Sequence, residues 1–221
     1  MNSNDIALIP GIKICGFKDR ATAEGALAAG ADFLGFNFYP KSPRYIEPKA
    51  AAEIIRDLPP GVAVGLWVNP TREQLAAEIE LSRVAIVQLQ GDETPNLCGG
   101  LGLPVIKAFR LGEPADLDLI PPYLGRVWAV LADAKTGLWG GSGHRGDWEL
   151  SVRAKTFTDR LFLAGGLSPD NVAEAVRQVR PWAVDVCSGV ESEPGVKDLE
   201  KIKRFIEAVK SAVTESSPNE D

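Results

Sequence analysis

Residues 161–190, LFLAGGLSPDNVAEAVRQVRPWAVDVCSGV, contain a strand pattern, a helix pattern and a second strand pattern in succession. The runs 161–164 and 183–188 are nearly all apolar, which is typical of strands buried on both faces. Between them Pro169 stands where the first turn of a helix begins, and a helix is predicted over 169–179. This order favours two parallel strands joined by a right-handed crossover.

The same alternation extends over the rest of the chain. Strands are predicted over 12–15, 33–39, 62–68, 85–90, 105–110, 127–132, 161–164 and 183–188. Helices are predicted over 21–29, 48–56, 72–81, 169–179 and 199–213. The segments after the fourth, fifth and sixth strands are rich in Gly, Pro and Asp and are expected to hold short helices or loops.

Eight such units predict a single-domain, parallel eight-stranded (β/α)8 TIM barrel over residues 1–221, with a short polar tail at about 214–221. An open doubly wound sheet is the alternative. That fold normally has a glycine-rich dinucleotide turn after its first strand, and the residues after Cys15 do not form one.

Composition narrows the class of function. A net charge of -6 opposes a broad electrostatic hold on nucleic acid, and no run is long and apolar enough for a membrane helix. The start lacks the basic and then apolar pattern of a secretory signal, so we expect a cytoplasmic protein. Three widely spaced cysteines and one histidine, His144, suggest neither a disulfide framework nor a metal centre. We assign His144 no role.

In a barrel of this kind, chemistry occurs where the strands end. Cys15 ends the first strand, and alternation places Lys13 on the same face, where its charge favours a thiolate and hence a base. The alternative is a buried thiol without a catalytic role. Asp133 directly follows the apolar sixth strand, where burial would raise its pKa and suit a general acid. The alternative is an aspartate that caps a turn.

Two glycine turns follow the last two strands. Gly165 and Gly166 precede a predicted helix, and Ser188 with Gly189 follows the eighth strand. Phosphate sites of TIM barrels lie after these strands, so the two turns together predict a phosphate site. Arg44, on a proline-stiffened loop, could bind a carboxylate through two hydrogen bonds or be a solvated surface residue.

Five motifs together resemble the phosphoribosylanthranilate isomerase family. They are KICG at 13–16, GFNFYPKSPRYI at 35–46, VQLQGDE at 87–93, LAGGL at 163–167, and WAVDVCSGVE at 182–191 followed by PGVKD at 194–198. The resemblance covers about residues 12–210. It implies a (β/α)8 barrel that needs no cofactor and rearranges N-(5-phosphoribosyl)anthranilate to the carboxyphenylamino-deoxyribulose phosphate in tryptophan biosynthesis.

The resemblance also implies residue roles. Cys15 would be the general base and Asp133 the general acid, and Arg44 would hold the anthranilate carboxylate. Gly165, Gly166, Ser188 and Gly189 would form the phosphate site, and Asp185 would face the sugar. The expected partner is therefore a small phosphorylated aminosugar bound by a monomer or homodimer, without nucleic acid or a membrane.

The chain departs from the family pattern at several positions. Gln90 stands where the family usually has histidine, Cys187 where serine is common, and the loop 140–148 is altered. Two other hypotheses therefore remain open. One is a non-catalytic barrel that binds or senses a phosphorylated ligand, and the other is an isomerase of another aminoaldose phosphate, such as the related intermediate of histidine biosynthesis.

Overall fold

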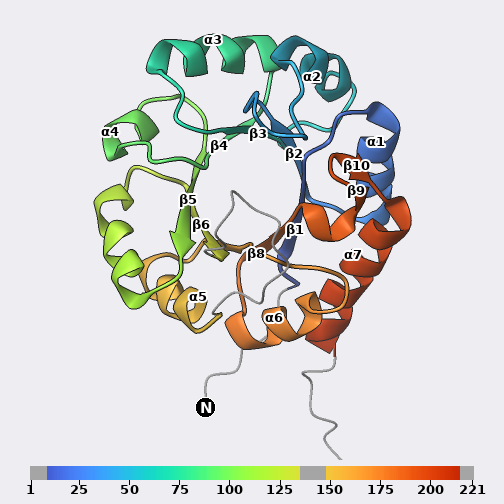
Figure 1. Cartoon of the computed structure of the whole chain (residues 1–221), viewed down its shortest axis with the longest axis vertical. Coiled ribbons are helices and arrows are strands. Elements are labelled where there is room, and N and C mark those ends of the chain that lie inside the picture. Colours follow the sequence, from blue (N-terminus) through green and yellow to red (C-terminus); the bar gives the residue numbers. More distant parts are fainter. Residues whose placement is uncertain (1–8, 135–147, 215–221) are drawn as a thin grey trace, which may run out of the picture.

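The computed structural model describes residues 9–134 and 148–214, and within them parallel strands close into a barrel surrounded by helices (Figure 1). The strands pair in chain order, and β8 pairs with β1 to complete the barrel. They are β1 (Gly11–Cys15), β2 (Phe33–Asn37), β3 (Ala63–Trp67), β4 (Ile86–Leu89), β5 (Val105–Leu111), β6 (Ala129–Ala134), β7 (Leu161–Leu163) and β8 (Ala183–Val186). The predicted (β/α)8 barrel is confirmed, and the open doubly wound sheet is wrong.

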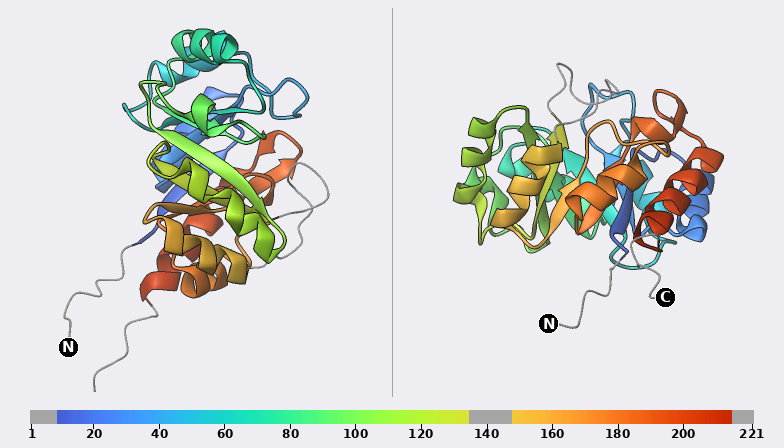
Figure 2. Two further views of the ribbon diagram at one scale, coloured as in Figure 1. Left: turned by 90° about the vertical axis from the view of Figure 1, so that its left-hand side faces the viewer. Right: turned by 90° about the horizontal axis from the view of Figure 1, so that it is seen from below.

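Helices lie outside the strands from every side, as Figure 2 shows. The α-helices are α1 (Arg20–Ala29), α2 (Pro48–Ile55), α3 (Arg72–Ser82), α4 (Pro95–Cys98), α5 (Trp148–Ala154), α6 (Val172–Val179) and α7 (Leu199–Thr214). Short 3-10 helices are η1 (Pro114–Leu119), η2 (Pro121–Tyr123), η3 (Lys155–Phe157) and η4 (Ser188–Val190). Short elements thus follow β4, β5 and β6, as predicted.

Some boundaries differ from the prediction for identifiable reasons. α6 begins at Val172 and not at Pro169, because the Asn171 side chain accepts a hydrogen bond from the Ser168 amide and holds a turn there. β6 continues to Ala134, two residues beyond the predicted end, because β5 extends to Leu111 and the two strands stay paired to their ends. Asp133 therefore lies within β6 and not in the loop after it.

The barrel has an inner and an outer apolar core. The larger, outer core fills the space between strands and helices. The inner core is small and includes Val64, Ile106, Leu131 and Phe162. Beneath it, Trp128 and Trp182 precede β6 and β8 and meet edge to face at 5.2 Å, and Phe33 and Phe162 pack with them. These aromatic rings fill the barrel at the amino ends of the strands, so the interior is accessible from the carboxyl ends.

A hairpin that the sequence patterns did not predict follows η4. Its strands are β9 (Glu191–Glu193) and β10 (Val196–Lys197), which pair antiparallel. In the residues that the structure describes, no helix has the length and apolar character needed to cross a membrane.

Candidate active site

A cavity of about 490 Å³ opens at the carboxyl ends of the strands. It brings together seven of the eight residues predicted to form a site, namely Cys15, Arg44, Asp133, Gly165, Gly166, Asp185 and Ser188. The eighth, Gly189, does not line it. Strand alternation explains this gathering, because residues two apart on one strand point to the same face. Lys13 and Cys15 on β1 accordingly face the interior beside Asp185 on β8.

The thiol of Cys15 lies among groups that favour its ionised form. A hydrogen bond from Cys187 is the largest influence and, with the nearby Lys13 ammonium, it outweighs burial and lowers the Cys15 pKa to about 6. The pKa of Cys187 is correspondingly raised, because its proton is shared with Cys15 and because it is buried. The sulfur of Cys187 also lies 4.0 Å from Glu191 Oε1, which makes a long hydrogen bond.

The space for the Cys15 thiol is provided by Gly35 on β2. A Cβ atom at position 35 would lie 2.7 Å from Cys15 Sγ and 2.9 Å from its Cα, so any larger residue would displace the thiol. Gly35 therefore fixes where the sulfur stands in the cavity.

Lys13 is fully buried and pairs with Asp185, whose Oδ1 lies 2.8 Å from Lys13 Nζ. Burial alone would lower the pKa of Lys13, but the negative charges of Asp185 and Cys15 raise it above its ordinary value. The lysine thus stays charged beside the thiol, and it cannot act as the acid or base of the site.

The pKa of Asp133 is shifted in the opposite direction to that of Cys15. Burial, with repulsion from Asp185, raises its pKa from 3.8 to about 6. Gln90 Nε2 donates to Asp133 Oδ2 at 3.0 Å, and Gln88 Nε2 donates to Gln90 Oε1 at 2.8 Å. Gln90, one of the departures from the family pattern, therefore has a defined structural role, since it orients the carboxyl group of Asp133.

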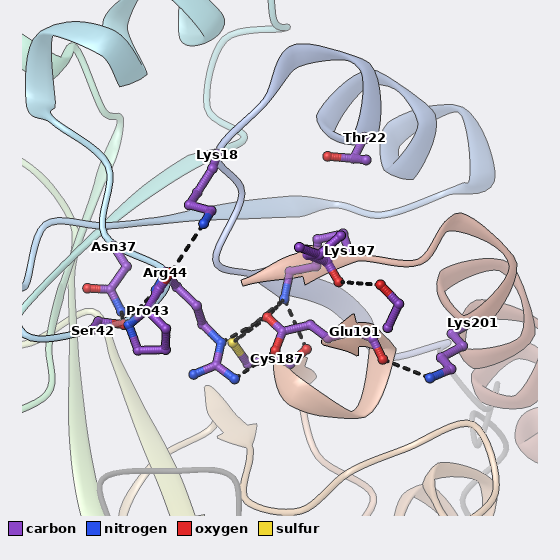
Figure 3. Close-up of polar contacts among 12 residues, drawn as sticks. Lys18, Thr22, Asn37, Ser42, Pro43, Arg44, Cys187, Glu191, Lys197 and Lys201 are labelled. Carbon is purple, nitrogen blue, oxygen red and sulfur yellow. Dashed lines mark hydrogen bonds and ion pairs between the residues drawn. The ribbon is translucent and has the colours of Figure 1, made fainter. Parts of the chain in front are cut away.

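Arg44 is held by an acidic partner from the hairpin (Figure 3). Its Nε and Nη2 donate to the two carboxylate oxygens of Glu191 at 2.8 and 2.7 Å. Burial would raise the pKa of Glu191, but the hydrogen bonds from Arg44 and Lys197 lower it. Lys197 Nζ lies 2.7 Å from Glu191 Oε1 and 3.7 Å from Cys187 Sγ. The hairpin therefore holds Arg44, which lines the cavity, and places Lys197 beside Cys187.

The two glycine turns pack directly against one another. Gly165 and Gly166 have φ of 86° and 65°, a backbone conformation that residues other than glycine rarely adopt. Asn171 Nδ2 donates a hydrogen bond to the Gly166 carbonyl oxygen. A Cβ atom on Gly189 would lie 2.0 Å from the Leu167 carbonyl oxygen. Although Gly189 does not line the cavity, its missing side chain lets the second turn approach the first.

Pattern reasoning missed Glu191, Lys197 and Gln88 as components of the site. Glu191 belongs to the motif at 182–191, but its partner Arg44 lies 147 residues away from it in the chain. Alternation from Gln90 could have placed Gln88 on the interior face. His144 and the altered loop at 140–147 lie outside the described residues.

Within 9–134 and 148–214, no three or more His, Cys, Asp or Glu side chains are arranged to bind a metal ion. A cofactor-free reaction stays a prediction.

Comparison with known proteins identifies close relatives. The family model described as N-(5'phosphoribosyl)anthranilate (PRA) isomerase matches residues 12–208. The N-(5'-phosphoribosyl)anthranilate isomerase of Trichlorobacter lovleyi is 50% identical over 204 residues, which cover 91% of this chain and 98% of that relative. The enzyme of Myxococcus xanthus is 43% identical over 203 residues, 90% of this chain and 96% of that relative.

Solved structures of phosphoribosylanthranilate isomerases also match this chain. The crystal structure of phosphoribosyl anthranilate isomerase from Thermotoga maritima matches with a TM-score of 0.86 and 39% identity, over 91% of this chain and 99% of that one. A second isomerase structure contains reduced 1-(o-carboxyphenylamino)-1-deoxyribulose 5-phosphate. It matches with a TM-score of 0.82 and 38% identity over the same shares of the two chains.

Proposed function

Because the chain belongs to the N-(5'-phosphoribosyl)anthranilate isomerase family, we propose that it rearranges N-(5-phosphoribosyl)anthranilate to 1-(2-carboxyphenylamino)-1-deoxyribulose 5-phosphate in tryptophan biosynthesis. One observation carries the proposal. A single cavity contains a thiol whose pKa is lowered and a carboxyl group whose pKa is raised, both to about 6. An acid and a base are thus available together.

The reaction requires both groups. Asp133, protonated at the start, donates its proton to the ribose ring oxygen, and the ring opens to a Schiff base. Cys15, ionised at the start, removes the proton from C2 and leaves an enolamine, which becomes the ketone. Lys13 stabilises the thiolate, and Gln90 holds the carboxyl of Asp133 at a fixed orientation.

The phosphate, sugar and anthranilate groups of the substrate are assigned to different residues of the cavity. The phosphate is bound by backbone amides of the turns at Gly165–Gly166 and Ser188–Gly189, where the nearby start of α6 favours negative charge. Asp185 faces the sugar.

Part of the Arg44 guanidinium remains available to donate hydrogen bonds to the anthranilate carboxylate. Nε and one N–H of Nη2 point at Glu191, which leaves the edge formed by Nη1 and the second N–H of Nη2. This edge has the fork geometry that binds a carboxylate through two hydrogen bonds. Glu191 therefore acts as a positioning residue that aims this edge.

Growth of a bacterial strain that lacks this isomerase tests the function. The wild-type chain should restore growth without tryptophan, and Cys15→Ala should not. Cys98→Ala is the matched control, because Cys98 is a buried thiol in the outer core that does not line the cavity. Failure of the wild-type chain, while it is present as folded protein, would contradict the proposal.

Oligomeric state and location remain predictions. We expect a cytoplasmic enzyme that is a monomer or a homodimer, and a Thermotoga maritima relative is named as dimeric. Sedimentation equilibrium of the purified chain would distinguish the two states.

A further inference from the structure

Cys15 and Cys187 occupy opposing positions across the line where the barrel closes. Ile14 and Val186 are register partners in the parallel pairing of β1 and β8, and Cys15 and Cys187 directly follow these two residues in the chain. Neighbouring strands lie about 4.8 Å apart. Disulfides join Cα atoms about 4.4–6.8 Å apart, so this spacing suits one.

The side chains of the two cysteines also point to the same face. Two residues earlier, Lys13 and Asp185 meet across the same pair of strands at 2.8 Å. Alternation then directs the next pair of side chains into the cavity, and both thiols do line it. Each thiol shifts the pKa of the other, which requires the two sulfur atoms to lie close together.

The surroundings make this pair reactive. Lys13 and Lys197 lie near the two sulfur atoms, and cations of this kind favour the nucleophilic thiolate. The open cavity admits small molecules to both sulfurs. Cys98 differs from this pair, because it lies in the outer core, does not line the cavity, and has a pKa that burial raises to about 11.

From this geometry we propose that Cys15 and Cys187 form an oxidation site that hydroperoxides convert to an intramolecular disulfide. The Cys15 thiolate attacks one oxygen of hydrogen peroxide, the O–O bond breaks, and a sulfenic acid and hydroxide form. The Cys187 sulfur then attacks the Cys15 sulfur and forms the S–S bond. The thiol proton of Cys187 and the hydroxyl group of the Cys15 sulfenic acid leave together as water. Peroxide is reduced by two electrons, and the two thiols supply them.

The disulfide removes the thiolate that acts as base in the proposed reaction. Only this consequence rests on the proposed function, because disulfide formation needs no substrate. A small dithiol reverses the bond by exchange and returns both thiols.

Peptide mapping of peroxide-treated protein tests the site directly. The folded full-length chain, treated with a small excess of hydrogen peroxide and then alkylated, should lose two of its three free thiols. One linked peptide pair should contain Cys15 and Cys187. Cys98→Ser should give the same pair. Cys187→Ser should give no disulfide, and its Cys15 should accumulate sulfenic acid that dimedone traps.

Two results would overturn the proposal. One is a wild-type protein whose Cys15 and Cys187 are recovered in separate peptides, as free thiols or as sulfinic acids. The other is a disulfide that contains Cys98. Since the measurement reads mass and thiol count, it is independent of whether the chain has isomerase activity.

Discussion

Asp133 lies where an ionised carboxylate is unfavourable, and this environment suits its proposed role as the general acid. Its pKa rises from 3.8 to about 6 because the group is buried near Asp185. A raised pKa in the folded state means that the fold loses stability as the pH rises from about 3.8 to about 6. The protein therefore gives up stability at neutral pH to keep a proton available.

Asp133→Asn should accordingly stabilise the fold at neutral pH. The shift corresponds to about 3 kcal/mol at most, so urea unfolding at pH 7.5 should show a gain of roughly 1–3 kcal/mol. At pH 5 the gain should be smaller, because the wild-type carboxyl is then largely protonated in the folded state. An equal gain at both pH values would show that the charge is not its cause.

Cys187 sets the protonation of Cys15, and the pH profile should reveal it. The free enzyme is competent when Cys15 is ionised and Asp133 is protonated, so kcat/KM should form a bell around pH 6. Cys187→Ala removes the hydrogen bond that lowers the Cys15 pKa. The maximum should then fall and move to higher pH, because fewer molecules combine the two required states.

The measurement is kcat/KM against pH for both forms. A Cys187→Ala profile with the same optimum as the wild type would assign the low pKa of Cys15 to Lys13 alone.

At the scale of elements, the site depends on how closely neighbouring loops approach. The turn after β7 and the turn after β8 touch where Gly189 meets the carbonyl of Leu167. Both turns contribute to the proposed phosphate site, so their spacing determines whether one phosphate contacts both.

Gly189→Ala should push these turns apart. The added Cβ would lie 2.0 Å from a backbone oxygen, which must move, at a cost of about 1–3 kcal/mol in stability. Calorimetry should show weaker binding of inorganic phosphate. Gly99→Ala is the matched control, since its Cβ would meet no atom closer than 4.0 Å. Unchanged phosphate binding in Gly189→Ala would place the phosphate elsewhere.

At the scale of the whole molecule, the barrel closes between its first and last strands. The buried ion pair of Lys13 and Asp185 lies on this line, beside Cys15, the proposed base. Removing one partner leaves the other charge buried without compensation.

Asp185→Ala should therefore destabilise the fold by about 3–5 kcal/mol, measured by urea unfolding. The double variant Lys13→Met with Asp185→Leu removes both charges and should recover most of this loss. A cost below about 1 kcal/mol for Asp185→Ala would show that water or a shifted Lys13 compensates the charge.

Much of this architecture could be predicted from local patterns. Apolar runs located each strand of the barrel, and alternation placed Lys13 beside Cys15, because both signals depend only on neighbours in the chain. The end of β6 was wrong by two residues, since it depends on pairing with β5. The bidentate pair of Arg44 and Glu191 was missed because it joins residues 147 apart through a hairpin without a strong strand pattern.

The measurement that tests the central claim most directly is the loss of anthranilate fluorescence from freshly prepared N-(5-phosphoribosyl)anthranilate, coupled to the next enzyme of the pathway. The account predicts turnover by the wild-type chain and a fall of about 10²–10⁴-fold in kcat for Asp133→Asn, which keeps the shape but cannot donate the proton. Wild-type protein that binds the reduced product analogue without turnover, or Asp133→Asn with unchanged kcat, would contradict it.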